Sequence, residues 1–162
     1  MKLLPIILAI GSVTLFACAE QNALPPEVLA AMHQQGSSGT PHNRQYPTYT
    51  GEYLCEQGGT GLNLQILGDD GHGMTYGIFH FFPLPTNPNV PAGSFVLKGL
   101  FDVDRGMIQM EPTTWITRPI GYRAVGLNGA STDGSVTFEG QVTGILVGCS
   151  TFKIRRNGVA AS

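Results

Sequence analysis

The residue best suited to nucleophilic chemistry in this sequence is Cys55, which stands in the stretch GEYLCEQGGTG. A thiol nucleophile needs a base beside it, and His72 and His80 follow Cys55 in the same part of the chain. The thiol would also have to be free, so this interpretation depends on the two other cysteines, Cys18 and Cys149.

Two acidic segments contain the residue types of a cation site. Asp69, Asp70 and His72 occur in GDDGHG, and Asp102 and Asp104 occur in DVDRG. The second segment lacks the later ligands and the terminal glutamate that a calcium loop requires. Tight turns also select aspartate and glycine, so we interpret both segments as turns and predict neither a metal nor another cofactor.

Four glutamates could supply the carboxylate pair of a glycoside hydrolase, namely Glu52, Glu56, Glu111 and Glu139. The sequence does not fix the distance between any two of them. A hydrolase that uses these carboxylates or His80 in a cleft is therefore an alternative function. The chain contains no GxSxG turn, no HExxH motif and no phosphate-binding loop.

Aromatic and arginine residues gather in WITRPIGYR, where Trp115, Arg118, Tyr122 and Arg123 form a candidate partner-binding surface. Aromatic rings next to arginine stack on sugars or anchor a protein partner. The alternative is that Trp115 and Tyr122 close one end of a β-sheet core. A partly exposed Trp115 beside Arg118 would favour binding, whereas full burial of Trp115 would exclude it.

The first residues, MKLLPIILAIGSVTLFACAE, have the three-part layout of a secretory signal peptide. Lys2 provides the early positive charge, and the uncharged run of 15 residues from Leu3 to Ala17 precedes small residues. This run is shorter than the ~20 residues of a membrane-spanning helix. We therefore predict an exported protein with a signal peptide at residues 1–17 and no transmembrane helix.

Leu15, Phe16, Ala17 and Cys18 together resemble the bacterial lipoprotein signal. The resemblance implies that Cys18 carries a lipid and becomes the first residue after cleavage. Ala19, in place of aspartate, implies transfer to the outer membrane in a bacterium with two membranes, on its periplasmic or outer surface. Ordinary cleavage after the AxA pattern of Ala17 and Ala19 is the alternative and would release a secreted or soluble periplasmic protein.

If Cys18 carries lipid, Cys55 and Cys149 remain as an even pair in an oxidising compartment. We therefore predict a Cys55–Cys149 disulfide instead of a reactive Cys55. In the chain-entropy model, closing a loop of roughly 95 residues stabilises the fold by about 4 to 5 kcal/mol.

Residues 18–47 mix polar, small and proline residues, which predicts a lipid-anchored flexible tether. Within it, PPEVLAAMHQQG favours a short helix with proline at its start and Gly36 after its end. His33 and His42, which also lie in the tether, have no metal-binding spacing. A C-terminal tail at residues 157–162 follows the folded domain.

Residues 48–156 show short apolar alternations separated by glycine, which predict an all-β domain. We expect about eight strands, arranged as an antiparallel β-sandwich or a small β-barrel. The expected strands cover residues 51–55, 62–67, 75–82, 94–102, 106–112, 122–129, 135–144 and 149–156, with TTWITRPIG as a connection. Glycine and proline, 22 and 11 residues of the chain, fit a fold of short strands and many turns.

Several short patterns resemble a small, uncharacterised bacterial β-domain. They are GxYxCxQGxT at 51–60, GSF at 93–95, Trp115, PIGY at 119–122 and GCSTFKIRR at 148–156. The resemblance implies one domain and brings no activity with it.

A net charge of −2 and a charged fraction of 12% exclude the clustered basic surface of a nucleic-acid-binding protein. We expect a non-enzymatic, lipid-anchored envelope protein whose β-domain binds an envelope protein or a glycan. Small periplasmic lysozyme inhibitors are similar in pairing a YxC strand with a late cysteine, as in Tyr53, Cys55 and Cys149. Their serine-glycine and tyrosine inhibitory loop does not occur in this chain.

Overall fold

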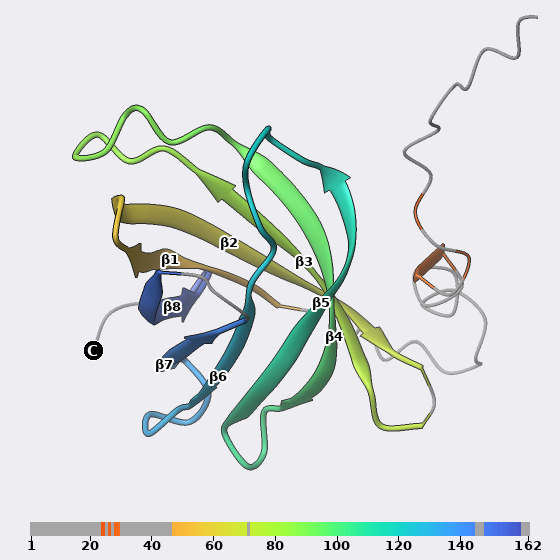
Figure 1. Cartoon of the computed structure of the whole chain (residues 1–162). Coiled ribbons are helices and arrows are strands. Elements are labelled where there is room, and N and C mark those ends of the chain that lie inside the picture. Colours follow the sequence, from red (N-terminus) through yellow and green to blue (C-terminus); the bar gives the residue numbers. More distant parts are fainter. Residues whose placement is uncertain are drawn as a thin grey trace, which may run out of the picture.

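The computed structural model describes residues 24, 26, 28, 29, 47–70, 72–144 and 148–159. Eight antiparallel strands form one sheet that closes into a barrel (Figure 1). Each strand pairs with the next one along the chain, and the last strand pairs with the first. The strands are β1 (Thr48–Cys55), β2 (Gly58–Asp69), β3 (Thr75–Phe82), β4 (Gly93–Asp102), β5 (Met107–Thr117), β6 (Gly126–Ala130), β7 (Thr137–Thr143) and β8 (Cys149–Arg156).

This architecture confirms the predicted all-β fold of about eight strands. Of the two predicted arrangements, the closed barrel is the one that forms. Alternating side chains point into it, as on β2, where Leu62 and Leu64 are fully buried and Gln65 is exposed. Aromatic rings dominate the interior, and they come from Tyr49, Tyr53, Phe79, Phe81, Phe95, Phe138 and Phe152.

Glycines occupy inward positions where neighbouring strands approach closely. A Cβ on Gly51 of β1 would overlap the carbonyl oxygen of Lys153 on β8. A Cβ on Gly99 of β4 would likewise overlap the carbonyl oxygen of Gln109 on β5. The absence of a side chain at these points lets the strands bend tightly enough to close a barrel of eight strands.

The structure corrects two of the expected strand boundaries. β5 extends through Trp115 to Thr117, whereas this segment was expected to be a connection. Pro112, which cannot donate a hydrogen bond to the sheet, lies at a register shift between Val96 and Leu97, where an irregular ladder accommodates it. The strand expected from residue 122 begins only at Gly126, and residues 118–125 form a loop.

Loops lie at both ends of the barrel. We call one end the mouth, which is formed by residues 56–57, 83–92, 118–125 and 148. The opposite end, the base, is formed by residues 70, 72–74, 103–106 and 131–136. β1 starts at the base, so the N-terminal segment enters the barrel there.

A short piece of the predicted tether packs on the outside of the barrel. Pro26, Val28 and Leu29 have helical backbone, and Val28 is only 1% exposed. The predicted signal peptide at residues 1–17, the lipid site Cys18 and most of the tether lie outside the described residues. Within the described part of the chain, no helix is long and apolar enough to span a membrane.

Candidate binding site at the barrel mouth

The pairing of β5 with β6 ends partway along β5, on the mouth side. β6 pairs only with the first four residues of β5, Met107–Met110, so residues 111–117 pair with β4 alone. The Glu111 carboxylate of β5 accepts a hydrogen bond from the Thr143 hydroxyl of β7 at 2.9 Å, which links β5 directly to β7. The loop 118–125 follows this part of β5, and Tyr122, Ala124 and Val125 from the loop pack against the core.

The structure brings together the aromatic and arginine residues that the sequence singled out. Trp115 is partly buried, with its ring edge-on to the ring of Phe95 at a centroid distance of 5.0 Å. The guanidinium carbon of Arg118 lies 5.7 Å from the centre of the Trp115 ring. Arg118 also donates a hydrogen bond from Nε to the carbonyl oxygen of Tyr122 at 3.3 Å. These contacts place the arginine over the tryptophan at the rim of the mouth.

Loop 118–125 presents an apolar side chain to solvent at its tip. Ile120 is fully exposed. The backbone around it forms a turn in which Tyr122 N–H donates to the Pro119 carbonyl at 3.2 Å. Gly121 adopts a φ of 82°, a conformation that side-chain-bearing residues rarely take. Ile120 therefore projects from a fixed turn, and its exposure was not predicted from the sequence, although its position between proline and glycine is a signal for a turn.

A hollow of about 350 Å³ lies beside this loop. Tyr122 and Arg123 line it from the loop, and Tyr53, Glu56 and Gln57 line it from β1 and the turn that follows. Sequence reasoning missed Tyr53 and Gln57 as site residues because their approach to residues 122–123 depends on barrel closure. Burial raises the pKa of the Tyr53 hydroxyl to about 12, so this group is neutral at physiological pH.

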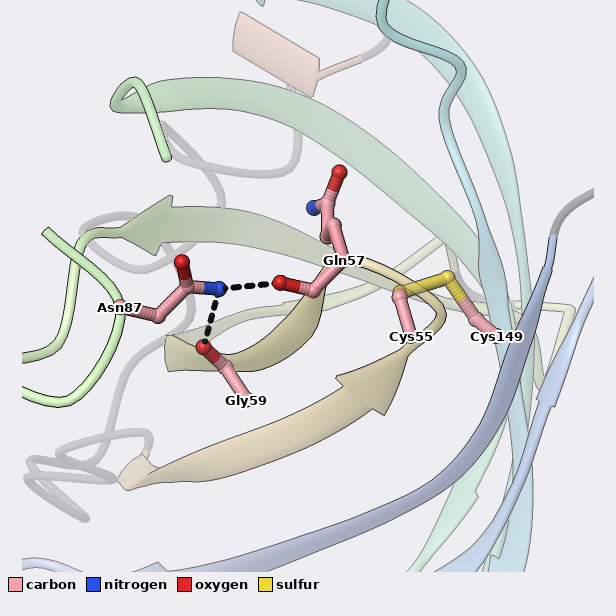
Figure 2. The surroundings of a disulfide bond; sticks show 5 residues. All are labelled: Cys55, Gln57, Gly59, Asn87 and Cys149. Atoms are coloured by element: carbon pink, nitrogen blue, oxygen red, sulfur yellow. Dashed lines mark hydrogen bonds between the residues drawn. A yellow bond between two sulfur atoms is a disulfide. The ribbon is translucent and has the colours of Figure 1, made fainter. Parts of the chain in front are cut away.

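The disulfide between Cys55 and Cys149 also lines the hollow. Cys55 and Cys149 are bonded to each other and are paired in register at the mouth end of the β1–β8 ladder. The predicted disulfide is thus confirmed, and the hypothesis of a nucleophilic Cys55 is wrong because the sulfur of Cys55 is bonded to that of Cys149. Beside it, the Asn87 side-chain amide donates to the carbonyls of Gln57 at 2.8 Å and Gly59 at 3.1 Å (Figure 2). This side chain ties the loop 83–92 to the β1–β2 turn.

The acidic segments form turns, as predicted. Asp70 accepts hydrogen bonds from the N–H groups of His72 and Met74 and pairs with Lys98 at 3.3 Å. The His72 N–H is the largest of the contacts that lower the pKa of Asp70. Asp102 accepts from the N–H groups of Asp104 and Arg105. In the part of the chain that the structure describes, no three histidine, cysteine or acidic side chains are placed to hold a metal ion.

Among the candidate hydrolytic groups, Glu56 lines the hollow at the mouth, and Glu111 lies on β5 in the hydrogen bond with Thr143 described above. Glu52 and Glu139 are exposed on the outer face of the barrel, where they line a shallow hollow of about 480 Å³. Lys153 on β8 is the register partner of both Glu52 on β1 and Glu139 on β7. Its ammonium group forms an ion pair with Glu139 at 3.1 Å. This exposed, ion-paired setting differs from the apolar pocket that a proton-donating carboxylic acid needs.

His80, the other candidate, lies half-buried on the outer face of β3. Its register partners are Asn63 on β2 and Ser94 on β4, and its ring stacks on Phe82 at 5.8 Å. Neither register partner is a carboxylate that could orient the imidazole as a catalytic base.

The mouth thus combines a fixed apolar tip, an arginine stacked on an aromatic ring, and a polar hollow. These groups suit recognition of another molecule by contact and hydrogen bonding. No family model, no curated protein and no solved structure matches this chain.

Proposed function

We propose that the protein is a non-enzymatic lipoprotein of the cell envelope that binds a partner protein through its barrel mouth. The exposure of Ile120 on the fixed loop above Trp115 and Arg118 is the observation that carries this proposal. A fully exposed isoleucine loses contact with water only when another molecule covers it. Burying such a side chain stabilises a complex by about 1.5 to 3 kcal/mol.

The neighbouring residues strengthen this site. Tryptophan, tyrosine and arginine are the residue types that contribute most to the stability of protein interfaces. Arg118 is already held by the Trp115 ring and the Tyr122 carbonyl, so less side-chain entropy is lost when a partner binds. An envelope enzyme whose cleft admits residues 118–123 is one form of such a partner, and the protein would then act as its inhibitor.

A glycan is the second candidate ligand, because of the hollow beside the loop. Tyr122 and Arg123 line it with residue types that carry hydroxyl and guanidinium groups, and Glu56 lines it with a carboxylate-bearing residue. Among the residues that line this hollow, Glu56 is the only acidic one. Glycoside hydrolysis ordinarily requires two carboxyl groups, so binding without cleavage fits the hollow better.

Photo-crosslinking in the cell envelope tests the partner-binding proposal. A photoreactive residue at position 120 should give a discrete crosslinked product with one protein. The same residue at Met107, which is exposed at the start of β5 near the base, is the matched control. The proposal would be wrong if both positions gave the same products, or if Arg118→Ala left the crosslink at position 120 unchanged.

The lipid anchor rests on the resemblance of residues 15–18 to the lipoprotein signal, and it has a separate test. Cys18→Ser should abolish incorporation of labelled fatty acid and shift the protein from the membrane to the soluble fraction. Continued membrane association of this variant would refute lipidation. Release of an unlipidated parent protein would instead favour cleavage after Ala19.

A further inference from the structure

An apolar patch lies on the outer face of the barrel, where most neighbouring positions are polar. It consists of Leu67 on β2, Tyr76 and Ile78 on β3, Val96 on β4 and Ile116 on β5, and we call it the outer patch. Tyr76 is 4% exposed and Val96 is fully buried, although both point away from the barrel core. Something outside the barrel therefore covers them.

Residues of the N-terminal segment provide this cover. Val28, which has helical backbone, is buried in one cluster with residues of the outer patch, and Leu24 packs against this cluster. Burial of the two side chains stabilises docking by about 3 to 5 kcal/mol. Ordering the backbone costs about 1 kcal/mol or more for each docked residue. The free-energy gain and cost of docking are thus similar, and a single polar substitution at Val28 is enough to release the N-terminal residues from the outer patch.

Docking changes how far the barrel can move from a lipid on Cys18. An extended chain spans at most ~3.5 Å per residue, so the segment from Cys18 to Leu24 reaches only ~20 Å. Without docking, the segment from Cys18 to Thr48 would reach ~100 Å. The docked turn thus replaces a long tether by a short one that starts from one side of the barrel.

We propose that docking of Leu24 and Val28 on the outer patch orients the barrel, with its β2–β5 side facing the membrane surface. This inference rests on the proposed lipidation of Cys18. It assigns to the outer patch a role in positioning the barrel, and it leaves the mouth at a separate place on the molecule. The β7–β8 side, across the barrel from the patch, faces away from the lipid.

Fluorescence energy transfer to labelled lipid headgroups tests this orientation. Full-length protein is expressed in cells, purified with its lipid, and placed in vesicles of phosphatidylethanolamine and phosphatidylglycerol. One donor dye is attached to an added cysteine at Gln65, exposed on β2, or at Thr151, exposed on β8. Transfer should be stronger from position 65 than from position 151. Val28→Asp should abolish this difference, and Val28→Ile should preserve it.

Two controls separate the inference from its premise. Leu54→Asp places the same charge at an exposed position of β1, away from the outer patch, and should keep the difference in transfer. Mass spectrometry of the purified protein reports the acyl groups on Cys18. If the protein is acylated but energy transfer is equal from positions 65 and 151, the orientation alone is overturned. The same holds if the difference in transfer between these positions is unchanged in Val28→Asp. Absence of acyl groups on Cys18 overturns the orientation together with the proposed lipid anchor.

Discussion

At the scale of single residues, Tyr53 links the core to the mouth. Its ring packs edge-on to Phe79 with the ring centroids 5.6 Å apart, and Tyr53 is also one of the residues that line the hollow. Burial disfavours the tyrosinate anion, and this is the main cause of the raised pKa of Tyr53.

Tyr53 should make stability depend on pH in the alkaline range. The ordinary pKa of a tyrosine is 10.0, and that of Tyr53 in the folded protein is raised to about 12. Because the folded-state pKa is raised, this contribution to stability is complete below pH 10 and is lost as pH rises from 10 towards 12. Denaturant unfolding across this pH range should show a steeper loss of unfolding free energy for the parent than for Tyr53→Phe. Parallel pH profiles of the two proteins would show that Tyr53 ionises normally.

At the scale of elements, the strands close because glycine occurs where they come closest. Gly51 on β1 and Gly59 on β2 lie on paired strands, with Gly51 opposite Leu62 and Gly59 opposite Leu54, and they differ in the space around them. A Cβ at Gly51 would overlap the β8 backbone, whereas at Gly59 the nearest atom, on Leu84, would be 3.6 Å away. These two glycines therefore make a matched pair for substitution.

Gly51→Ala should destabilise the barrel by about 1 to 3 kcal/mol or more, because the β1 and β8 backbones would have to separate. Gly59→Ala should be nearly neutral, since its new methyl group meets only an ordinary van der Waals contact. Thermal and denaturant unfolding of both variants measure the effect. Equal stability of the two variants would contradict a role of Gly51 in closure.

The β6–β7 loop closes the base through a network centred on Asp133. The Asp133 carboxylate accepts hydrogen bonds from Thr137 N–H and from the Ser131 hydroxyl, each at 2.8 Å. These bonds, led by the one from Thr137, lower the pKa of Asp133 from 3.8 to about 2. In the same loop, Ser135 accepts a hydrogen bond from the Tyr49 hydroxyl through its backbone carbonyl at 3.1 Å. The loop thus covers the base end of the core.

Asp133→Asn should lower stability at neutral pH and have little effect at pH near 2. Because the folded-state pKa is depressed, the contribution of Asp133 is complete above pH 3.8 and is lost as pH falls towards 2. Carbon NMR titration of the carboxyl group measures the pKa, and unfolding at several pH values measures stability. Asp104→Asn is the control, since the Asp104 carboxylate accepts no hydrogen bond within the described residues. A loss of stability for Asp133→Asn that does not change with pH would exclude this account.

At the scale of the whole molecule, the β1–β8 seam joins the two ends of the domain. The disulfide crosses this seam and closes a loop between cysteines 94 positions apart in the sequence. Closure of a loop of this length restricts the unfolded chain more than the folded one. The disulfide therefore stabilises the closed barrel mainly by raising the free energy of the unfolded state.

Replacing both cysteines, as Cys55→Ser with Cys149→Ser, should lower the free energy of unfolding by about 2 to 5 kcal/mol. Reduction of the parent protein should give a similar loss and leave the double variant unchanged. Unfolding curves with and without reductant measure both effects. Free thiols at positions 55 and 149 in the untreated protein, detected by mass spectrometry of its peptides, would contradict the prediction.

The mouth and the outer patch lie on different parts of the barrel surface. Residues 118–123 and the polar hollow lie at the mouth, whereas the outer patch lies on the β2–β5 wall. A partner at the mouth and the docked N-terminal residues therefore contact different side chains.

Several features of this protein followed from the sequence alone. The alternation in LNLQIL and in TYGIFHFF predicted two strands correctly, because the two-residue period of a strand is a local property of the chain. Cysteine arithmetic likewise predicted the Cys55–Cys149 pair before any geometry was known. The grouping of Trp115 with Arg118 could be read from the sequence because the two residues are close along the chain.

The tertiary structure decided the rest. A sandwich and a barrel share the same alternation, and only the pairing of β1 with β8, between residues about a hundred positions apart, selects the barrel. The exposure of Ile120 and the hollow between Tyr53 and Arg123 depend on where β6 stops pairing with β5. The contact of Val28 with Val96 and Tyr76 depends on which face of the closed sheet points outward. These are long-range contacts, whose free energies depend on the whole closed sheet and not on any local pattern of residues.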